Sequence, residues 1–294
     1  MRTRGYDEVV SGGKLLWRVG ELELDCGERT LVMGILNVTP DSFSDGGRFL
    51  DHDAAVEHAI RMAGDGADII DVGGESTRPG SDPVSSEEER DRVVPVIERL
   101  AKELSETPIS IDTRKPDVAA AALEAGATIV NDVSGGLDPE MFDVVRDARA
   151  GMVLMHMLGD PKTMQQEPRY DDVVAEVREY LNQRLEAAAF AGIEPERLCI
   201  DPGIGFGKDL EHNLTLMHHL DALLDLGRPV LVGPSRKRFI GTLLDLPDDQ
   251  RAEGTAGAVA WLVARGAHIV RVHDVKEMVR VVRVVDAIAR AGRR

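Results

Sequence analysis

The sequence has few cysteines and no long apolar run, and each shortage argues against a class of protein. The two cysteines, Cys26 and Cys199, lie far apart without a CxxC or Cys/His spacing. Neither a disulfide framework nor a structural zinc site is therefore expected, and both are interpreted as buried thiols. No stretch of about 18 uncharged apolar residues predicts a membrane span, and no signal-peptide pattern follows Met1. We expect a cytoplasmic protein.

Positive charge is also scarce. The chain has 35 Lys and Arg against 52 Asp and Glu, a net charge of −17. Long-range repulsion argues against nucleic-acid or membrane partners, so small molecules are the expected ligands. An anionic ligand would need a local basic cluster, and two follow apolar runs, at 235–238 (Ser-Arg-Lys-Arg) and 271–273 (Arg-Val-His).

What the sequence does contain is a regular series of eight short apolar runs. They are nearly continuous rather than alternating and are rich in Val and Ile, which is typical of parallel strands covered on both faces. The runs lie at 31–36, 69–72, 109–111, 128–130, 152–155, 198–200, 230–232 and 269–272.

Segments with helical spacing separate these runs, for example 54–63 and 118–125. Eight strand–helix units in roughly 250 residues predict an α/β fold, a (β/α)8 TIM barrel, and we expect one domain over 1–294. The alternative, a doubly wound sheet, usually has fewer strands and a Gly-rich fingerprint after the first. Residues 14–27 alternate and turn near Gly20, which predicts an N-terminal β-hairpin covering the barrel bottom.

Polar residues follow every predicted strand, where a barrel places its active site. Helix N-capping would equally explain Asp132, Ser235 and Asp274, but not the basic residues. The full set is Asn37, Asp71, Asp112, Asn131, Asp132, His156, Asp201, Ser235, Arg236, Lys237, Arg271, His273 and Asp274.

Three loops stand out. Residues 37–49 and 73–83 are dense in Gly, Pro, Ser and Asp and are interpreted as lids over the site, where Phe43 and Phe49 either contact ligand or pack on the rim. Residues 201–208 carry alternate glycines, but the spacing matches neither GxGxxG nor the Walker motif. We expect these glycines to let the backbone approach a flat ligand beneath Phe206.

Four motifs are specific in combination: Asn-Val-Thr-Pro-Asp-Ser-Phe-Ser-Asp-Gly-Gly at 37–47, Gly-Glu-Ser-Thr-Arg-Pro-Gly at 74–80, Ser-Arg-Lys at 235–237 and Arg-Val-His-Asp at 271–274. With their order and spacing, the chain resembles the dihydropteroate synthase family of the folate pathway along the whole barrel. The resemblance implies condensation of 6-hydroxymethyl-7,8-dihydropterin diphosphate with 4-aminobenzoate, Mg2+ assistance and a homodimer.

The resemblance also implies roles for individual residues. A carboxylate accepts well from the 2-amino and N3–H edge of a pterin, which is the role that falls to Asp201. The implied pterin-binding residues are Asp112, Asn131, Met155, Asp201, Phe206, Lys237 and Arg271; the diphosphate-binding residues Asn37, Thr77, Arg78, Arg271 and His273; the aminobenzoate-binding residues Phe43, Pro79 and Arg238; the metal contact Asn37; and the catalytic residues Asn37, Asp112 and Lys237.

The implied chemistry is best interpreted as dissociative. The C–O bond would break first, and the Asp112 carboxylate would stabilise a cationic pterin before the arylamine captures it; an associative displacement stays open. The chain departs from many family members at Arg238, where they carry Ser. Backbone N–H groups at the helix N-terminus would then bind the aminobenzoate carboxylate. The sequence leaves open whether the Arg238 side chain also contacts it.

Three other functions compete with this interpretation. A pterin-dependent methyltransferase-type barrel would share the pterin edge but would not need Arg78, Arg271 and His273. A catalytically silent pterin-binding paralogue would be expected to lose loop residues that are present here. A Schiff-base aldolase would place its lysine in an apolar pocket rather than between Arg236 and Arg238.

Overall fold

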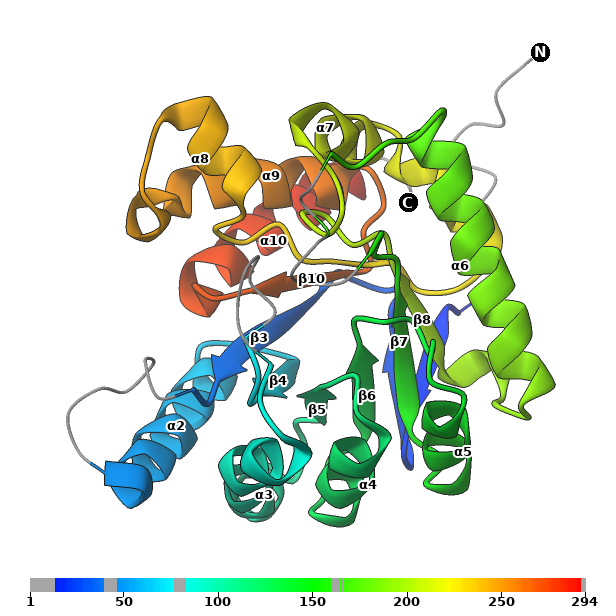
Figure 1. Ribbon diagram of the computed structural model, residues 1–294. Coiled ribbons are helices and arrows are strands. Elements are labelled where there is room, and N and C mark those ends of the chain that lie inside the picture. The colour runs from blue at the N-terminus through cyan, green and yellow to red at the C-terminus, as the bar shows by residue number, and fades with distance from the viewer. Residues whose placement is uncertain (1–13, 40–46, 77–82, 160–163, 165–166, 292–294) are drawn as a thin grey trace.

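The computed structural model describes residues 14–39, 47–76, 83–159, 164 and 167–291. Within these, eight parallel strands follow one another in the order β8-β7-β6-β5-β4-β3-β10-β9, and an Ile200–Val230 bridge joins the two ends. The predicted (β/α)8 barrel is confirmed (Figure 1). The barrel strands are β3 (Leu31–Asn37), β4 (Ile69–Gly73), β5 (Ile109–Asp112), β6 (Ile129–Asp132), β7 (Gly151–Met155), β8 (Leu198–Asp201), β9 (Leu231–Val232) and β10 (Ile269–Val272).

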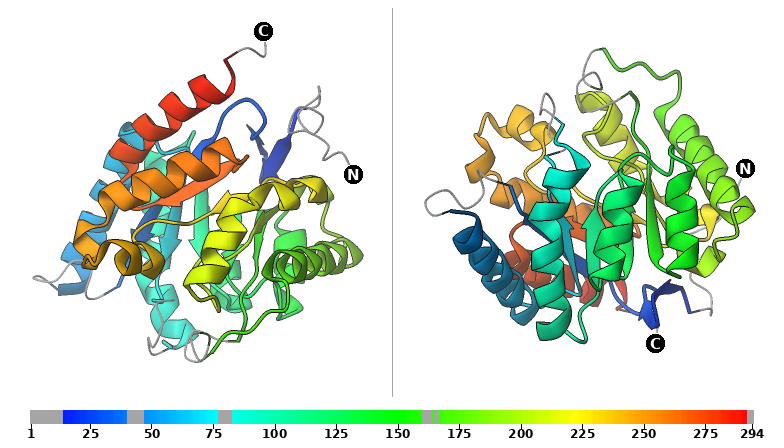
Figure 2. Two further views of the ribbon diagram at one scale, coloured as in Figure 1. Left: turned by 90° about the horizontal axis from the view of Figure 1, so that it is seen from above. Right: turned by 60° about the horizontal axis from the view of Figure 1, so that its bottom comes forward.

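Helices surround the strands, and α2 to α5 lie side by side along the outside of the barrel (Figure 2, right). The α-helices are α2 (Gly47–Gly64), α3 (Ser86–Glu103), α4 (Pro116–Glu124), α5 (Glu140–Asp147), α6 (Val173–Phe190), α7 (Leu210–His218), α8 (Arg238–Leu244), α9 (Ala252–Ala264) and α10 (Val275–Ala289), with short 3-10 turns η2 (Pro195–Arg197), η3 (Leu220–Leu226) and η4 (Asp248–Gln250).

One boundary differs from the expectation. Phe49 was predicted in the first long loop, whereas α2 already begins at Gly47 and includes it. The predicted helix started at Ala54 because the clear apolar spacing begins there, but Arg48, Phe49 and Leu50 continue the same helix toward its amino end. The loop after β3 is therefore shorter than predicted.

Each barrel strand is buried on both faces, which explains the continuous apolar runs. Along β3, Val32 and Leu36 pack beneath the helices, whereas Leu31 and Met33 point into the barrel. Because alternate strand residues face opposite sides, both sets have to be apolar. The ribbon of strands is thus held between two apolar layers.

The predicted N-terminal hairpin is confirmed as β1 (Leu16–Val19) and β2 (Leu22–Asp25). Trp17 and Val19, both fully buried, pack into the barrel interior with the first residues of several strands. Trp17 Nε1 donates to the Arg197 carbonyl at 2.9 Å, and the Arg197 guanidinium returns a bond to the Gly20 carbonyl at 3.1 Å. The hairpin therefore plugs the amino-terminal end of the barrel and leaves the other end for ligands.

Cys26 and Cys199 lie in the same interior cluster, free and buried as predicted. Burial raises the pKa of Cys26 to about 12, so this thiol is poorly reactive near neutral pH.

Among the described residues, none of the helices has the length and apolar character needed to cross a membrane.

Candidate active site

The carboxyl ends of β3 to β6 bring predicted site residues into one row. In the ladder, Asn37 pairs with Gly73, Gly73 with Asp112, and Asp112 with Asn131. A Cβ at Gly73 would lie 3.6 Å from Asp112 Cβ and 3.9 Å from Asn37 Oδ1. Glycine at this position therefore leaves a gap between the two polar side chains that a single Cβ would fill.

Arg271 on β10 connects this row to β4. Its Nε donates to Asp71 Oδ2 and its Nη2 to Asp112 Oδ2, both at 2.5 Å. Asn131 Nδ2 donates to the same Asp71 oxygen at 3.1 Å. Burial opposes the charge on Arg271, but the two carboxylates outweigh it and raise the pKa of the guanidinium. The arginine is a fixed cation at the centre of the site.

Two carboxylate oxygens in this cluster remain available. Asp71 Oδ1 and Asp112 Oδ1 are buried and have no hydrogen-bond partner in the part of the chain that the structure describes. Burial raises the pKa of Asp112 to about 7, Arg271 works against that rise, and Asp71 and Glu89 add to it. A buried acceptor without a donor is costly, so a ligand that donates here would be favoured.

A second group lies at the end of β8. Asp201, also buried, accepts from the Gly203 N–H at 2.7 Å, and burial raises the pKa of this carboxyl group to about 6. Lys237 Nζ lies 3.8 Å from the centroid of the Phe206 ring. Burial, aided by the nearby Arg271 charge, lowers the pKa of Lys237 to about 8. A carboxylate, an ammonium group and an aromatic face thus converge.

Met155 and Phe206, predicted to form an apolar slot, belong to one small cluster with Val133 and Met164. Met155 pairs with Asp201 in the β7–β8 ladder, so the cluster borders the carboxylate. An apolar pocket with polar groups at one edge suits a flat heterocycle.

A buried lysine that the sequence analysis did not single out shapes the loop 201–208. Lys208 Nζ lies 2.8 Å from His156 Nδ1 and donates to the carbonyls of Phe206 and Gly203 at 2.9 and 3.1 Å. Burial lowers the pKa of Lys208 to about 7 and that of His156 to about 3. These bonds hold the loop against β7 and fix the backbone that carries Phe206.

The loop approaches β7 so closely that Gly203 is required. A Cβ at Gly203 would lie 1.9 Å from the His156 carbonyl oxygen, at φ +67°; Gly227 has the same φ with no atom within 4 Å. We expect Gly203→Ala to lower the free energy of unfolding by about 1–3 kcal/mol more than Gly227→Ala, because only the former adds a backbone clash to the unfavourable φ. Urea unfolding of both variants measures the difference, and equal losses would contradict the clash.

The remaining basic clusters have partners within the barrel. Ser235 Oγ lies 2.9 Å from His273 Nδ1, and Arg236 pairs with Asp274 through a 2.5 Å contact. Neither Ser235 nor Asp274 caps a helix through its side chain. Asp132 does serve a local role, accepting from the backbone N–H groups of Ser134 and Gly136.

Arg238 is exposed and is the first residue of α8. Phe43, Thr77, Arg78 and Pro79 lie outside the described residues. Asp71 was noted at a strand end but not assigned to the site, although it accepts from both Arg271 and Asn131. A charged residue inside the apolar run 69–72 was the signal that could have identified it.

Comparisons with known proteins identify the family of the chain. Residues 33–273 match the family model "Pterin binding enzyme". A dihydropteroate synthase of Synechocystis is 48% identical over 274 residues, which cover 92% of this chain and 94% of the relative. The Yersinia pestis dihydropteroate synthase with a sulfonamide drug complex gives a TM-score of 0.89 at 44% identity, covering 94% of this chain and 100% of that one. The Xanthomonas albilineans enzyme with 4-aminobenzoic acid gives 0.88 at 48%, covering 94% and 98%.

Because the family model covers residues 33–273, the parallel barrel is that of a pterin-binding enzyme. Within that class, the chain belongs to the dihydropteroate synthase family.

Proposed function

We propose that the chain condenses 6-hydroxymethyl-7,8-dihydropterin diphosphate with 4-aminobenzoate, giving 7,8-dihydropteroate and pyrophosphate. The observation that carries the proposal is the set of buried acceptors around Arg271, with free oxygens on Asp71 and Asp112. The proposal is supported by relatives named dihydropteroate synthase that align along nearly the whole chain. A silent paralogue or a methyltransferase-type barrel finds no comparable support.

The pterin would lie between the apolar cluster of Met155 and Phe206 and the carboxylate of Asp201. The pterin edge presents an amino group and an N3–H, so an ionised carboxylate satisfies both donors at once. Asn131 and Asp112 supply further polar contacts on the row from β5 and β6. Lys237, above the Phe206 ring, would donate to the oxygen and nitrogen edge of the pterin.

The diphosphate would lie near Asn37, Arg271 and His273, with Thr77 and Arg78 added from the loop after β4. Among the described residues, no group of three or more His, Cys, Asp or Glu could hold a metal ion. Mg2+ commonly binds through few protein oxygens together with substrate phosphates. Asn37 Oδ1, which borders the gap left by Gly73, would be the protein ligand. Bound there, the ion would neutralise charge on the departing pyrophosphate.

Asp112 is the residue that we assign to the reacting carbon. As C–O cleavage leaves positive charge on the pterin methylene, the Asp112 carboxylate would stabilise that charge. Arg271 holds Asp112 in place through the 2.5 Å bond. Phe43, Pro79 and the amino end of α8 at Arg238 would then surround the aminobenzoate.

The two substrates are expected to bind in order. Asn37 precedes the loop with Phe43, and Thr77 and Arg78 precede Pro79, so diphosphate is the one ligand that would contact both loops before aminobenzoate enters. We expect pyrophosphate, Mg2+ and a pterin together to raise aminobenzoate affinity at least about tenfold. Titrating aminobenzoate into apo and saturated protein by calorimetry tests this, and equal affinities would show that the loops do not complete the second site.

The overall activity is tested with purified protein, both substrates and Mg2+, by following dihydropteroate formation. Product that appears only with the pterin diphosphate supports the proposal. Pterin binding without product, under conditions where the Xanthomonas albilineans enzyme is active, would instead favour a silent paralogue. Gel filtration tests the proposed homodimer.

A further inference from the structure

Asp71 is a buried carboxylate that lies beneath the row of site residues and is assigned to neither substrate above. Gly73, two residues further along β4, pairs with Asp112 in that row. Because Ile69 packs in the barrel interior and alternate strand residues share a face, Asp71 and Gly73 also face inward. The Asp71 side chain is 0% exposed, whereas that of Asp112 is 8% exposed. Asp71 is therefore the deeper of the two carboxylates that contact Arg271.

One oxygen of Asp71 accepts two bonds from opposite sides of the site. Oδ2 accepts from Arg271 Nε at 2.5 Å and from Asn131 Nδ2 at 3.1 Å. Arg271 comes from β10 and Asn131 from β6, which are not neighbouring strands in the barrel. The other oxygen, Oδ1, has no hydrogen-bond partner in the part of the chain that the structure describes. Holding two donors on one acceptor restricts their rotamers before a ligand binds.

Charge balance does not explain this carboxylate. Arg271 also donates to Asp112 Oδ2 at 2.5 Å, so one guanidinium faces two carboxylates. Asp112 alone would balance that single positive charge, and burying a second carboxylate costs desolvation free energy. The geometry that Asp71 imposes on its two donors is the more direct explanation for its presence.

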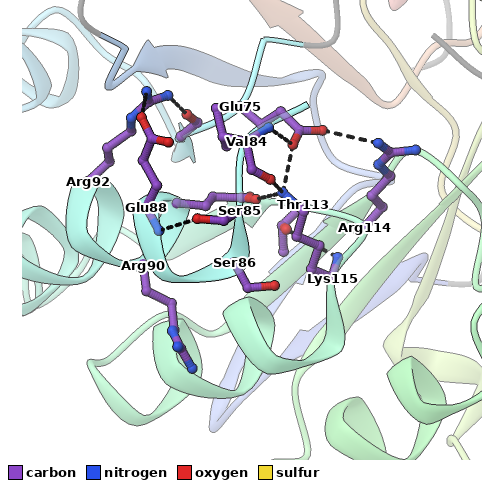
Figure 3. A network of polar contacts seen from close by, with 12 residues as sticks. Glu75, Val84, Ser85, Ser86, Glu88, Arg90, Arg92, Thr113, Arg114 and Lys115 are labelled. Atoms are coloured by element: carbon purple, nitrogen blue, oxygen red, sulfur yellow. Dashed lines mark hydrogen bonds and ion pairs between the residues drawn. The ribbon is translucent and has the colours of Figure 1, made fainter. Parts of the chain in front are cut away.

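The backbone at Asp112 does not depend on Asp71, because a separate ion network fixes the chain that follows it (Figure 3). The Lys115 N–H donates to Thr113 Oγ1 at 3.2 Å, and Lys115 Nζ donates to Glu75 Oε2 at 2.6 Å. Neither bond involves Asp71. A change at Asp71 is therefore expected to act on its two donors rather than on the backbone after β5.

We propose that Asp71 is a positioning residue for the pterin substrate, which holds the Asn131 amide and the Arg271 guanidinium in place through Oδ2. The proposal rests on the proposed function, in which Asn131 contacts the pterin and Arg271 lies near the diphosphate. Each step from Asp71 to a group that would contact this substrate is a hydrogen bond between described residues. A direct contact between Asp71 and the pterin would instead use Oδ1.

Two replacements of Asp71 separate these possibilities. Asp71→Asn keeps an acceptor in the place of Oδ2 and puts an amide NH2 in the place of Oδ1, whereas Asp71→Val removes both oxygens. We expect affinity for 6-hydroxymethylpterin to fall at least about tenfold in Asp71→Val, because both donors lose their acceptor, and to stay within about threefold in Asp71→Asn. Calorimetry under mildly alkaline conditions, where Asp112 and Asp201 are ionised despite their burial, measures both affinities. Thermal unfolding confirms that the variants are folded.

An equal loss of affinity in the two variants would overturn the proposal, because it would assign the effect to Oδ1 or to the charge. A loss of less than about threefold in Asp71→Val would overturn it as well. Asp71→Asn also decides the matter alone: a tenfold loss in that variant would contradict positioning through Oδ2 even if Asp71→Val did not fold.

A double-mutant cycle tests whether Asp71 acts through Asn131. In an Asn131→Ala background, one of the two groups that Asp71 holds is already missing. Asp71→Val should there cost at least about threefold less pterin affinity than it costs in wild type. A carboxylate that merely supported the barrel would give the same loss in both backgrounds, and that result would overturn the proposal.

Asp68→Val is the matched control. Asp68 is a carboxylate at the other end of the same strand, and it also pairs with an arginine, accepting from Arg29 Nη1 at 2.8 Å. The control should leave pterin affinity within about twofold of wild type. No pterin binding by wild type would overturn both the proposed function and the role of Asp71. Pterin binding without dihydropteroate formation would overturn only the condensation, and the Asp71 variants would still decide the positioning role.

Discussion

Replacing Asp201 by Ala is expected to lower pterin affinity by about 2–4 kcal/mol, roughly 30- to 700-fold, in a protein that stays folded. The variant leaves the pterin amino and N3–H donors without an acceptor in a slot bordered by Met155 and Phe206. Removing the carboxylate also frees the Gly203 N–H, which costs the fold about 1 kcal/mol. Calorimetry with 6-hydroxymethylpterin measures the loss, and thermal unfolding checks the fold. Affinity within threefold of wild type would remove Asp201 from the pterin site.

The pH dependence of pterin binding offers a second view of the same residue. Burial raises the pKa of Asp201 to about 6. Above that pH the group is ionised and accepts from both pterin donors; below it, the proton occupies one oxygen and turns it into a donor. Affinity is therefore expected to fall as the pH drops through about 6 in wild type, and this dependence should be absent in Asp201→Ala.

Asp112→Asn is expected to lower kcat by about 100- to 1,000-fold with a much smaller change in pterin affinity. Asn keeps the shape of the side chain, but it removes the negative charge that is needed only as the pterin methylene becomes cationic. Single-turnover kinetics with saturating substrates measure the chemical step directly. A loss confined to KM would make Asp112 a binding residue only.

The raised pKa of Asp112 also predicts how kcat/KM changes with pH. Burial raises the pKa of Asp112 to about 7, and the carboxylate is the active form. In wild type, kcat/KM should increase as the pH rises through about 7. Asp112→Asn should lose that step and retain only the lower one, near 6, that belongs to Asp201. An unchanged upper step in the variant would mean that another group controls it.

The strands were predictable because each must be apolar on both faces, so each strand appears in the sequence as a continuous apolar run rich in Val and Ile. The polar residues at their ends were predictable for the same reason, since a polar side chain is favoured only where such a run leaves the apolar layers. Asp132 also ends a run, but it binds backbone N–H groups of the turn that follows. Asn37, Asp112, Asn131 and Asp201 were all found in this way.

The contacts between these residues were not predictable, because they depend on register around a closed barrel. Arg271 was assigned to the diphosphate from its basic cluster, yet its two closest partners are carboxylates from β4 and β5. Lys208 has no local sequence signal, since a lysine in a polar loop is usually solvated. Only the folded chain shows that its ammonium group is surrounded by acceptors.

The distance along the chain between Arg271 and its partners bears on how the protein is made. Asp71 and Asp112 precede Arg271 by 200 and 159 residues, so both acids leave the ribosome long before the guanidinium that balances them. Until β10 is synthesised, the barrel consists of the other seven strands and has Asp71 and Asp112 without their cation and an unpaired β3 edge. The centre of the site is therefore among the last parts of the molecule to be assembled during translation, and a chain truncated before β10 would lack both closure and charge balance.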